Sequence, residues 1–138
     1  MINLKNKSPR LLVIGDLMVD QYLWGSCERI SPEAPVQVVN VDHESKVLGG
    51  AGNVVNNLKK FGAKVDVISV LGNCEISNEL LDLLSDIKVD TKYLVIQKNR
   101  ISSKKSRIIS SQQQVVRFDR ECSDEINEKS QNTIIKTF

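Results

Sequence analysis

Short apolar runs alternate with amphipathic stretches along the first two thirds of the chain. Residues 11–14 are four consecutive apolar side chains followed by Gly-Asp, a pattern typical of a strand buried on both faces of a parallel sheet. In residues 53–61, apolar side chains recur four and three positions apart, on one face of a helix that Gly62 would end. Residues 65–71 repeat the buried-strand pattern. The order strand, helix, strand predicts the α/β fold class.

The later part of the chain predicts a second helix, several short strands and a third helix. Leucine and isoleucine side chains between residues 80 and 87 form one apolar helix face, and Ser77 could cap that helix. Short extended stretches lie at residues 93–96, 107–109 and 115–118. Ser123 is placed to cap a third helix, whose apolar positions continue to Phe138.

Between the first strand and the first helix, the sequence predicts an irregular excursion. Residues 30–35 contain two prolines three positions apart. A helix is excluded there, because each proline lacks an N–H donor and keeps the preceding residue extended. We expect a loop that leads into an edge strand at residues 36–41.

Composition and charge narrow the class of protein. The chain has 138 residues, the length of one domain, and a net charge of +2, too small to predict a nucleic acid or a membrane as partner. Residues 98–120 are different, with seven basic side chains and one acidic one, a net charge of +6. An RNA-binding strip would need interleaved aromatic residues, and Phe118 is alone there. We therefore expect this segment to meet a small anion.

The three cysteines indicate a reducing compartment. They are 47 and 48 positions apart, without a CxxC pair, so neither a disulfide framework nor a zinc site is expected. No apolar run near the N-terminus has the form of a signal peptide or a membrane span. We expect a cytoplasmic protein.

Two carboxylates follow the first predicted strand. Asp16 and Asp20 lie where ligands bind in open α/β sheets, beyond the carboxyl ends of the strands. They would share one face if the chain stays extended, and both could then accept hydrogen bonds from sugar hydroxyls. The alternative is that one caps a turn while the other is solvated.

A glycine-rich turn precedes the first predicted helix. Gly49 and Gly50 would let the backbone approach a ligand, and the helix N-terminus would favour an anion. The turn is not a dinucleotide fingerprint, because Val55 stands where the third glycine is required. Asn53 could either cap the helix or bind the ligand.

Two cations are spaced to converge on one side of a strand. Lys105 and Arg107 are two positions apart, and an arginine fork matches a phosphate group. Gln113 and Arg117 follow shortly afterwards. The alternative is a solvated basic edge strand, which would discourage aggregation.

Taken together, these segments resemble the ribokinase-like (PfkB-type) carbohydrate kinases, and more narrowly the D-glycero-D-manno-heptose 7-phosphate kinases of bacterial lipopolysaccharide synthesis. The carrying segments span most of residues 11–121, and the Ile-Ser-Pro-Glu-Ala-Pro-Val run is specific to the heptose branch. In order they read GDLMVDQY with WG (15–25), RISPEAPV (29–36), GGAGNV (49–54), KSR (105–107) and QQVVRFD (113–119).

The resemblance implies roles for individual residues. Asp20 would bind sugar hydroxyls, the turn that begins at Gly49 would hold the sugar, and Lys105 and Arg107 would contact the sugar phosphate. The full set of substrate-binding residues that it implies is Asp20, Gly49, Gly50, Asn53, Lys105 and Arg107, with Asp16 and Gln113 as further contacts.

The resemblance also implies an architecture. Residues 1–138 would form the front half of a ribokinase-like three-layer α/β sandwich. A small β lid would comprise roughly residues 24–46 and part of 93–118, and such lids often pair two subunits into a homodimer. The family's ATP-binding half, with its Gly-Ala-Gly-Asp anion hole and catalytic aspartate, has no counterpart in these residues. We therefore expect no catalytic residue here and no activity from this chain alone.

For the full-length parent, the resemblance implies an ATP-dependent kinase. It would transfer the γ-phosphoryl of Mg-ATP to the anomeric hydroxyl of D-glycero-D-manno-heptose 7-phosphate, giving the 1,7-bisphosphate on the route to ADP-heptose. ATP and Mg²⁺ are thus expected for the parent, with a sugar phosphate as partner.

The sequence departs from the family pattern in three places. Gly52 replaces the usual Ala, residues 73–76 replace the usual Asp-Asp or Asp-x-x-Gly after Gly72, and residues 101–103 replace Pro-Thr-Thr. Three alternatives therefore stay open. The parent could be a ribokinase-like kinase for another sugar, the chain could be a non-catalytic sugar-binding or oligomerisation remnant, or it could be the poorly folding product of a decayed gene.

Overall fold

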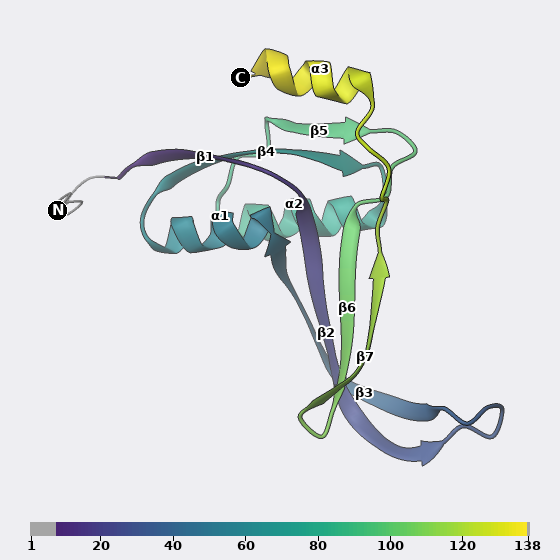
Figure 1. The fold of residues 1–138 in the computed structure, drawn as a ribbon. Helices are drawn as coiled ribbons and strands as arrows, with labels where there is room; N and C mark the ends of the chain where they lie inside the picture. The colour runs from purple at the N-terminus through teal and green to yellow at the C-terminus, as the bar shows by residue number, and fades with distance from the viewer. Residues whose placement is uncertain (1–7, 138) are drawn as a thin grey trace.

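The computed structural model describes residues 8–137 and contains two β-sheets (Figure 1). The smaller sheet has three parallel strands in the order β1-β4-β5. Its strands are β1 (Arg10–Ile14), β4 (Lys64–Gly72) and β5 (Leu94–Gln97). The parallel pairing confirms the predicted α/β class.

Helices lie on both sides of the smaller sheet, which gives the expected three layers (Figure 1). They are α1 (Ala51–Lys60), α2 (Glu75–Asp86) and α3 (Glu128–Thr137). The apolar faces of α1 and α2 pack on β4, where Val67 and Leu71 are fully buried together with Leu80 and Leu84. α3 lies beside β5 on the other side.

The second sheet has four strands in the order β3-β2-β6-β7 and extends away from the helices (Figure 1). Its strands are β2 (Leu17–Ile30), β3 (Gln37–Gly50), β6 (Ser103–Ser110) and β7 (Gln113–Arg120). β2 pairs with β3 antiparallel and with β6 parallel. We call this four-stranded sheet the lid sheet. The loop predicted at residues 30–35 lies at residues 31–36 and joins β2 to β3, which is an edge strand as expected.

The lid sheet is longer than predicted. β2 starts at Leu17, not at residue 24, and β3 continues to Gly50, because the two strands pair from Leu17 and Gly50 to Ile30 and Gln37, with register shifts after Trp24 and Cys27. Residues 94–97 do not belong to it, since β5 pairs with β4. The predicted range 24–46 was therefore too short at both ends, and the part of 93–118 that belongs to the sheet is β6 with most of β7.

The predicted helix caps were also wrong. α1 begins at Ala51 after Gly50, so Asn53 lies inside its first turn. α2 begins two residues before Ser77, whose hydroxyl instead donates to the Gly72 carbonyl at 2.6 Å. The local sequence pattern specifies neither the position of Asn53 inside α1 nor the hydrogen-bond partner of Ser77.

The third helix begins later than its apolar pattern suggested. α3 starts at Glu128, and the Asn127 side chain accepts a hydrogen bond from the Ser130 N–H at 2.9 Å, so Asn127 replaces Ser123 as the capping residue. The predicted end at Phe138 lies outside the described residues.

The prediction that β1 is buried on both faces is wrong for the described residues. Leu12 and Ile14 are 44% and 52% exposed, while Ile68 on β4 is 1% exposed. β1 pairs with β4 alone within residues 8–137, so no neighbouring strand shields its other edge.

One charged group joins the lid sheet to the helical layer. Glu79 on α2 accepts hydrogen bonds from Lys104 on β6 at 3.0 Å and from Lys46 on β3 at 3.1 Å. The ammonium groups lower the pKa of Glu79, although burial opposes them. This triad fixes two lid strands to the same helix.

Within residues 8–137, no helix is long and apolar enough to cross a membrane.

Candidate functional site

The candidate site lies where the lid sheet meets the smaller sheet, and its centre is Asp20. On β3, Gly49 is buried directly against the Asp20 side chain. A Cβ added at Gly49 would overlap the Asp20 carboxylate and lie 2.8 Å from Met18 Cγ. The glycine therefore leaves the space in which this carboxylate sits.

The second glycine shapes the turn into α1. Gly50 has φ +56° and ψ −131°, a conformation that favours glycine, and a Cβ there would lie 2.6 Å from the Asp16 carbonyl oxygen. That carbonyl accepts the Ala51 N–H at 2.9 Å. Asp16 thus shapes the turn through its main-chain carbonyl. The residue itself is exposed at the rim of the site.

The N-terminus of α1 opens beside this turn. Its first turn contains no acidic residue, and no side chain of the described residues caps it. Asn53 is exposed there, and its amide contacts Asn57 at 3.5 Å. Free N–H groups and the positive end of the helix dipole are therefore available to a polar ligand.

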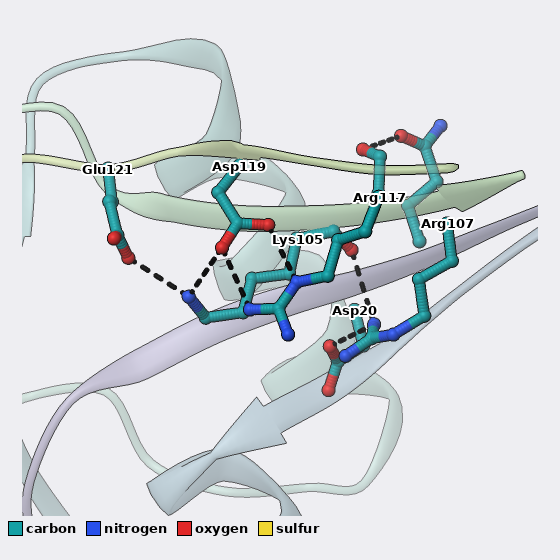
Figure 2. Close-up of polar contacts among 8 residues, drawn as sticks. Asp20, Lys105, Arg107, Arg117, Asp119 and Glu121 are labelled. Carbon is teal, nitrogen blue, oxygen red and sulfur yellow. Dashed lines mark hydrogen bonds and ion pairs between the residues drawn. The ribbon is translucent and has the colours of Figure 1, made fainter. Parts of the chain in front are cut away.

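Arg107 is the cation paired with Asp20 (Figure 2). Its Nη1 donates to Asp20 Oδ1 at 2.6 Å, and the two side chains are 19% and 20% exposed. The guanidinium also lies over the Tyr22 ring, 5.2 Å from its centroid. Neither Nε nor Nη2 has a hydrogen-bond partner within residues 8–137. The group is therefore anchored and still has donors for an anion.

Lys105 is paired with two carboxylates that the sequence analysis did not identify as its partners. Its Nζ contacts Asp119 at 3.1 Å and Glu121 at 3.0 Å (Figure 2). Arg117 also binds Asp119, and together with Lys105 it lowers the pKa of Asp119 to about 2. Both carboxylates in turn raise the pKa of Lys105.

This pairing corrects the expectation of a strongly basic segment. The three cations Lys105, Arg107 and Arg117 are matched by three carboxylates. The carboxylates are those of Asp20, Asp119 and Glu121. An anion would thus meet a neutral cluster of oriented donors, not an excess of positive charge.

The predicted residues are not all brought together. Asp20, Gly49, Gly50 and Arg107 form one group, with Lys105 beside it across the strands. Gln113 lies at the other end of β6 and β7, paired with Ser110. Ser110 is five positions along β6 from Lys105, a distance of about 16 Å along a strand.

A hollow of about 460 Å³ adjoins the group at the base of the lid sheet. It is lined by Asp16, Met18, Val70, Arg100 and residues 101–103 and 121–126. Its position next to the ends of β1 and β4 agrees with the general location of ligand sites in open α/β sheets.

Sequence reasoning missed the partners of the predicted cations. Tyr22 and Asp119 belong to recognised segments but were given no role. The spacing of Asp20 and Tyr22 was a usable signal, because residues two apart on a strand share a face. The carboxylate pairs of Lys105 had no such signal, since they depend on how β7 pairs with β6.

Gly49→Ala tests the fit between this glycine and Asp20. For the sugar ligand that the resemblance implies, the added methyl group should displace the carboxylate and weaken binding by about tenfold, the equivalent of ~1.4 kcal/mol. Titration calorimetry measures the affinity, and a thermal melt checks that the variant folds. Unchanged affinity would show that the position of Asp20 beside Gly49 does not matter for binding.

The fold is that of a ribokinase-like α/β domain: a parallel α/β core with a second, four-stranded sheet that extends from it. The model of the pfkB family carbohydrate kinases matches residues 8–136. The chain belongs to this family.

Two relatives in sequence have names that are more specific than the family description. The chain is 63% identical over 130 residues to the "Bifunctional protein HldE" of Aliarcobacter butzleri, covering 94% of this chain and 27% of that protein. It is 56% identical to the "Bifunctional protein HldE" of Sulfurimonas denitrificans, covering 97% and 28%. The chain thus spans little more than a quarter of the length of these relatives.

Solved structures support the fold. A sugar kinase structure from Clostridium perfringens matches with a TM-score of 0.70 at 18% identity, covering 96% of this chain and 41% of that one. A nucleoside kinase of Methanocaldococcus jannaschii, an archaeal member of the ribokinase family, matches with a TM-score of 0.60 at 17% identity, covering 83% and 37%.

Proposed function

We propose that this chain is the sugar-binding half of a D-glycero-D-manno-heptose 7-phosphate kinase. The observation that carries the proposal is the Asp20–Arg107 pair beside the Gly49-Gly50 turn, in a chain that shares 63% identity with a bifunctional HldE protein. The parent reaction would be phosphorylation of the anomeric hydroxyl by ATP, giving the 1,7-bisphosphate for ADP-heptose and lipopolysaccharide core synthesis.

The residues of this chain would bind and orient the sugar. The Asp20 carboxylate would accept hydrogen bonds from sugar hydroxyls, and the α1 N-terminus with Asn53 would donate to sugar oxygens. Arg107 and Lys105 would bind the 7-phosphate, and Asp16 at the rim would be a further contact to sugar hydroxyls. Gln113 lies too far along β6 and β7 to share this phosphate site. Orientation of the acceptor hydroxyl is the main protein contribution to phosphoryl transfer.

ATP and Mg²⁺ would be bound by the parent outside this chain. Among residues 8–137, no group of three or more His, Cys, Asp or Glu side chains is arranged to hold a metal ion. The sequence also contains no GxxxxGK[ST] phosphate loop. The nucleotide supplies the transferred phosphoryl group, and we assign no catalytic residue to this chain.

A homodimer through the lid sheet fits the exposed side chains of its edge. Val36, Val41 and Val47 are exposed on or beside the edge strand β3. A second copy could cover them, whereas we expect no nucleic acid and no membrane as partner. A cytoplasmic location would suit a substrate that is a soluble sugar phosphate.

The direct test is titration of the 138-residue chain with D-glycero-D-manno-heptose 7-phosphate. The matched ligands are the same heptose without phosphate and D-ribose 5-phosphate. We expect the heptose phosphate to bind most tightly. Tighter binding of ribose 5-phosphate would favour a kinase for another sugar, and no binding of any of the three would contradict the proposal.

A further inference from the structure

Arg117 faces Arg107 directly across strands β6 and β7. The two residues are register partners in an antiparallel pair, so their side chains leave the same face of the lid sheet. Asp20 and Tyr22 lie on this face too, since Tyr22 is the register partner of Arg107 on β2. Like charges placed opposite one another destabilise a sheet unless something compensates them.

Each arginine is compensated by a carboxylate of its own. Arg117 binds Asp119 with two parallel hydrogen bonds, Nε to Oδ1 at 2.9 Å and Nη2 to Oδ2 at 2.8 Å. Arg107 binds Asp20 through Nη1 (Figure 2). The charge of Asp20 also raises the pKa of Arg117, so the two pairs belong to one electrostatic group.

Both guanidinium groups keep unused donors. Within the described part of the chain, Nη1 of Arg117 has no hydrogen-bond partner, and neither has Nε or Nη2 of Arg107. The Arg117 side chain is 42% exposed, so a solute can reach it. Two anchored forks with free donors on one sheet face are suited to a tetrahedral oxyanion, which offers oxygens to both.

We propose that Arg117 binds the phosphate group of the sugar substrate together with Arg107, and that Asp119 holds Arg117 in position for this. The inference rests on the proposed function and adds a residue to it. A phosphate between the two arginines would accept hydrogen bonds from the guanidinium donors that Asp20 and Asp119 leave unused.

A purely structural role for Arg117 makes a different prediction. An exposed ion pair on an edge strand contributes little to stability, and it would be indifferent to the ligand. If Arg117 binds the phosphate, its loss should lower the affinity for phosphorylated ligands and leave the affinity for unphosphorylated ligands unchanged.

Arg120 provides the matched control. It is on the same strand, is exposed and carries the same charge, but its register partner is Lys104, whose ammonium points to Glu79 on α2. Arg120 therefore leaves the opposite face of the lid sheet. Arg120→Ala removes the same charge without touching the arginine pair.

The experiment titrates the full 138-residue chain with heptose 7-phosphate and with unphosphorylated heptose. We expect Arg117→Ala to weaken binding of the phosphorylated sugar about 10–30-fold, the effect of losing charge-assisted hydrogen bonds, and to leave binding of the other sugar unchanged. Arg117→Lys should fall between Arg117→Ala and the unmodified chain, because it keeps the charge and loses the fork. Arg120→Ala should change neither affinity by more than about twofold.

Equal affinities for Arg117→Ala and Arg120→Ala would overturn the role of Arg117 while leaving the proposed function intact. If the unmodified chain binds no heptose phosphate, the proposed function and this inference both fail. A circular dichroism melt of each variant checks the fold, and Arg117→Lys keeps the test decisive if Arg117→Ala unfolds.

Discussion

Replacement of Arg107 by Ala should weaken binding of heptose 7-phosphate about 10–100-fold, because it removes a charge-assisted donor and leaves Asp20 without its cation. At 2.6 Å, the Nη1–Oδ1 contact is the shortest ion pair of the candidate site, and both side chains have low exposure. Titration calorimetry on the 138-residue chain measures the change.

The comparison of ligands separates two roles of Arg107. If it binds the phosphate, the loss should be larger for heptose 7-phosphate than for unphosphorylated heptose. An equal loss for both sugars would show that Arg107 acts only by orienting Asp20. In a full-length relative, the same substitution should leave ATP binding nearly unchanged. Equal loss of sugar phosphate and ATP would contradict the assignment.

Glu79→Ala should lower the free energy of unfolding by about 2–3 kcal/mol, because two lysine ammonium groups lose a shared and partly buried partner. The Lys104 side chain is only 13% exposed, so water replaces the lost contact poorly. Urea unfolding measures the change. Glu75→Ala is the control on the same helix, because Glu75 is exposed and makes no ion pair within the described residues.

The stabilisation by Glu79 should depend on pH with a definite sign. Its pKa is lower in the folded chain than the ordinary value of 4.5. Such a carboxylate stabilises fully above its unfolded pKa, and the contribution disappears as pH falls through the folded pKa. The difference in stability between the unmodified chain and Glu79→Gln should therefore be constant from pH 6 to 7 and shrink below about pH 4.5. A difference that does not change down to pH 3 would contradict an ionised Glu79 as its source.

The sequence pattern correctly predicted the helices and strands in which apolar side chains recur with a regular spacing. The apolar positions of α1, α2 and β4 repeat within one element, and the Pro32 and Pro35 pair excludes a helix by backbone chemistry alone. The cap predicted at Ser77 failed, because its hydroxyl lies inside α2 and donates to the Gly72 carbonyl instead of accepting an N–H of the first helical turn. Such a choice depends on what the fold brings nearby.

For the candidate site, the sequence likewise predicted the identity of several residues but not their positions relative to one another. Residue type and resemblance identified Asp20, Gly49 and Arg107 from the sequence, because a carboxylate, a glycine turn and an arginine fork each have chemistry of their own. Their relation was decided by the tertiary structure. Asp20 and Arg107 are 87 positions apart, and they meet only because β2 pairs with β6 in one register. A shift of that register by one residue would send one of them to the opposite face, since strand side chains alternate.

The charge of the site was likewise beyond the sequence. A count of residues 98–120 indicated an excess of positive charge, but the pairing of β7 with β6 and the position of β2 place a carboxylate against each of Lys105, Arg107 and Arg117. The sequence alone determined which charged groups exist and how each element repeats. Only the tertiary structure decided which groups neutralise one another, because ion pairs form over a few ångströms of space and without regard to distance along the chain.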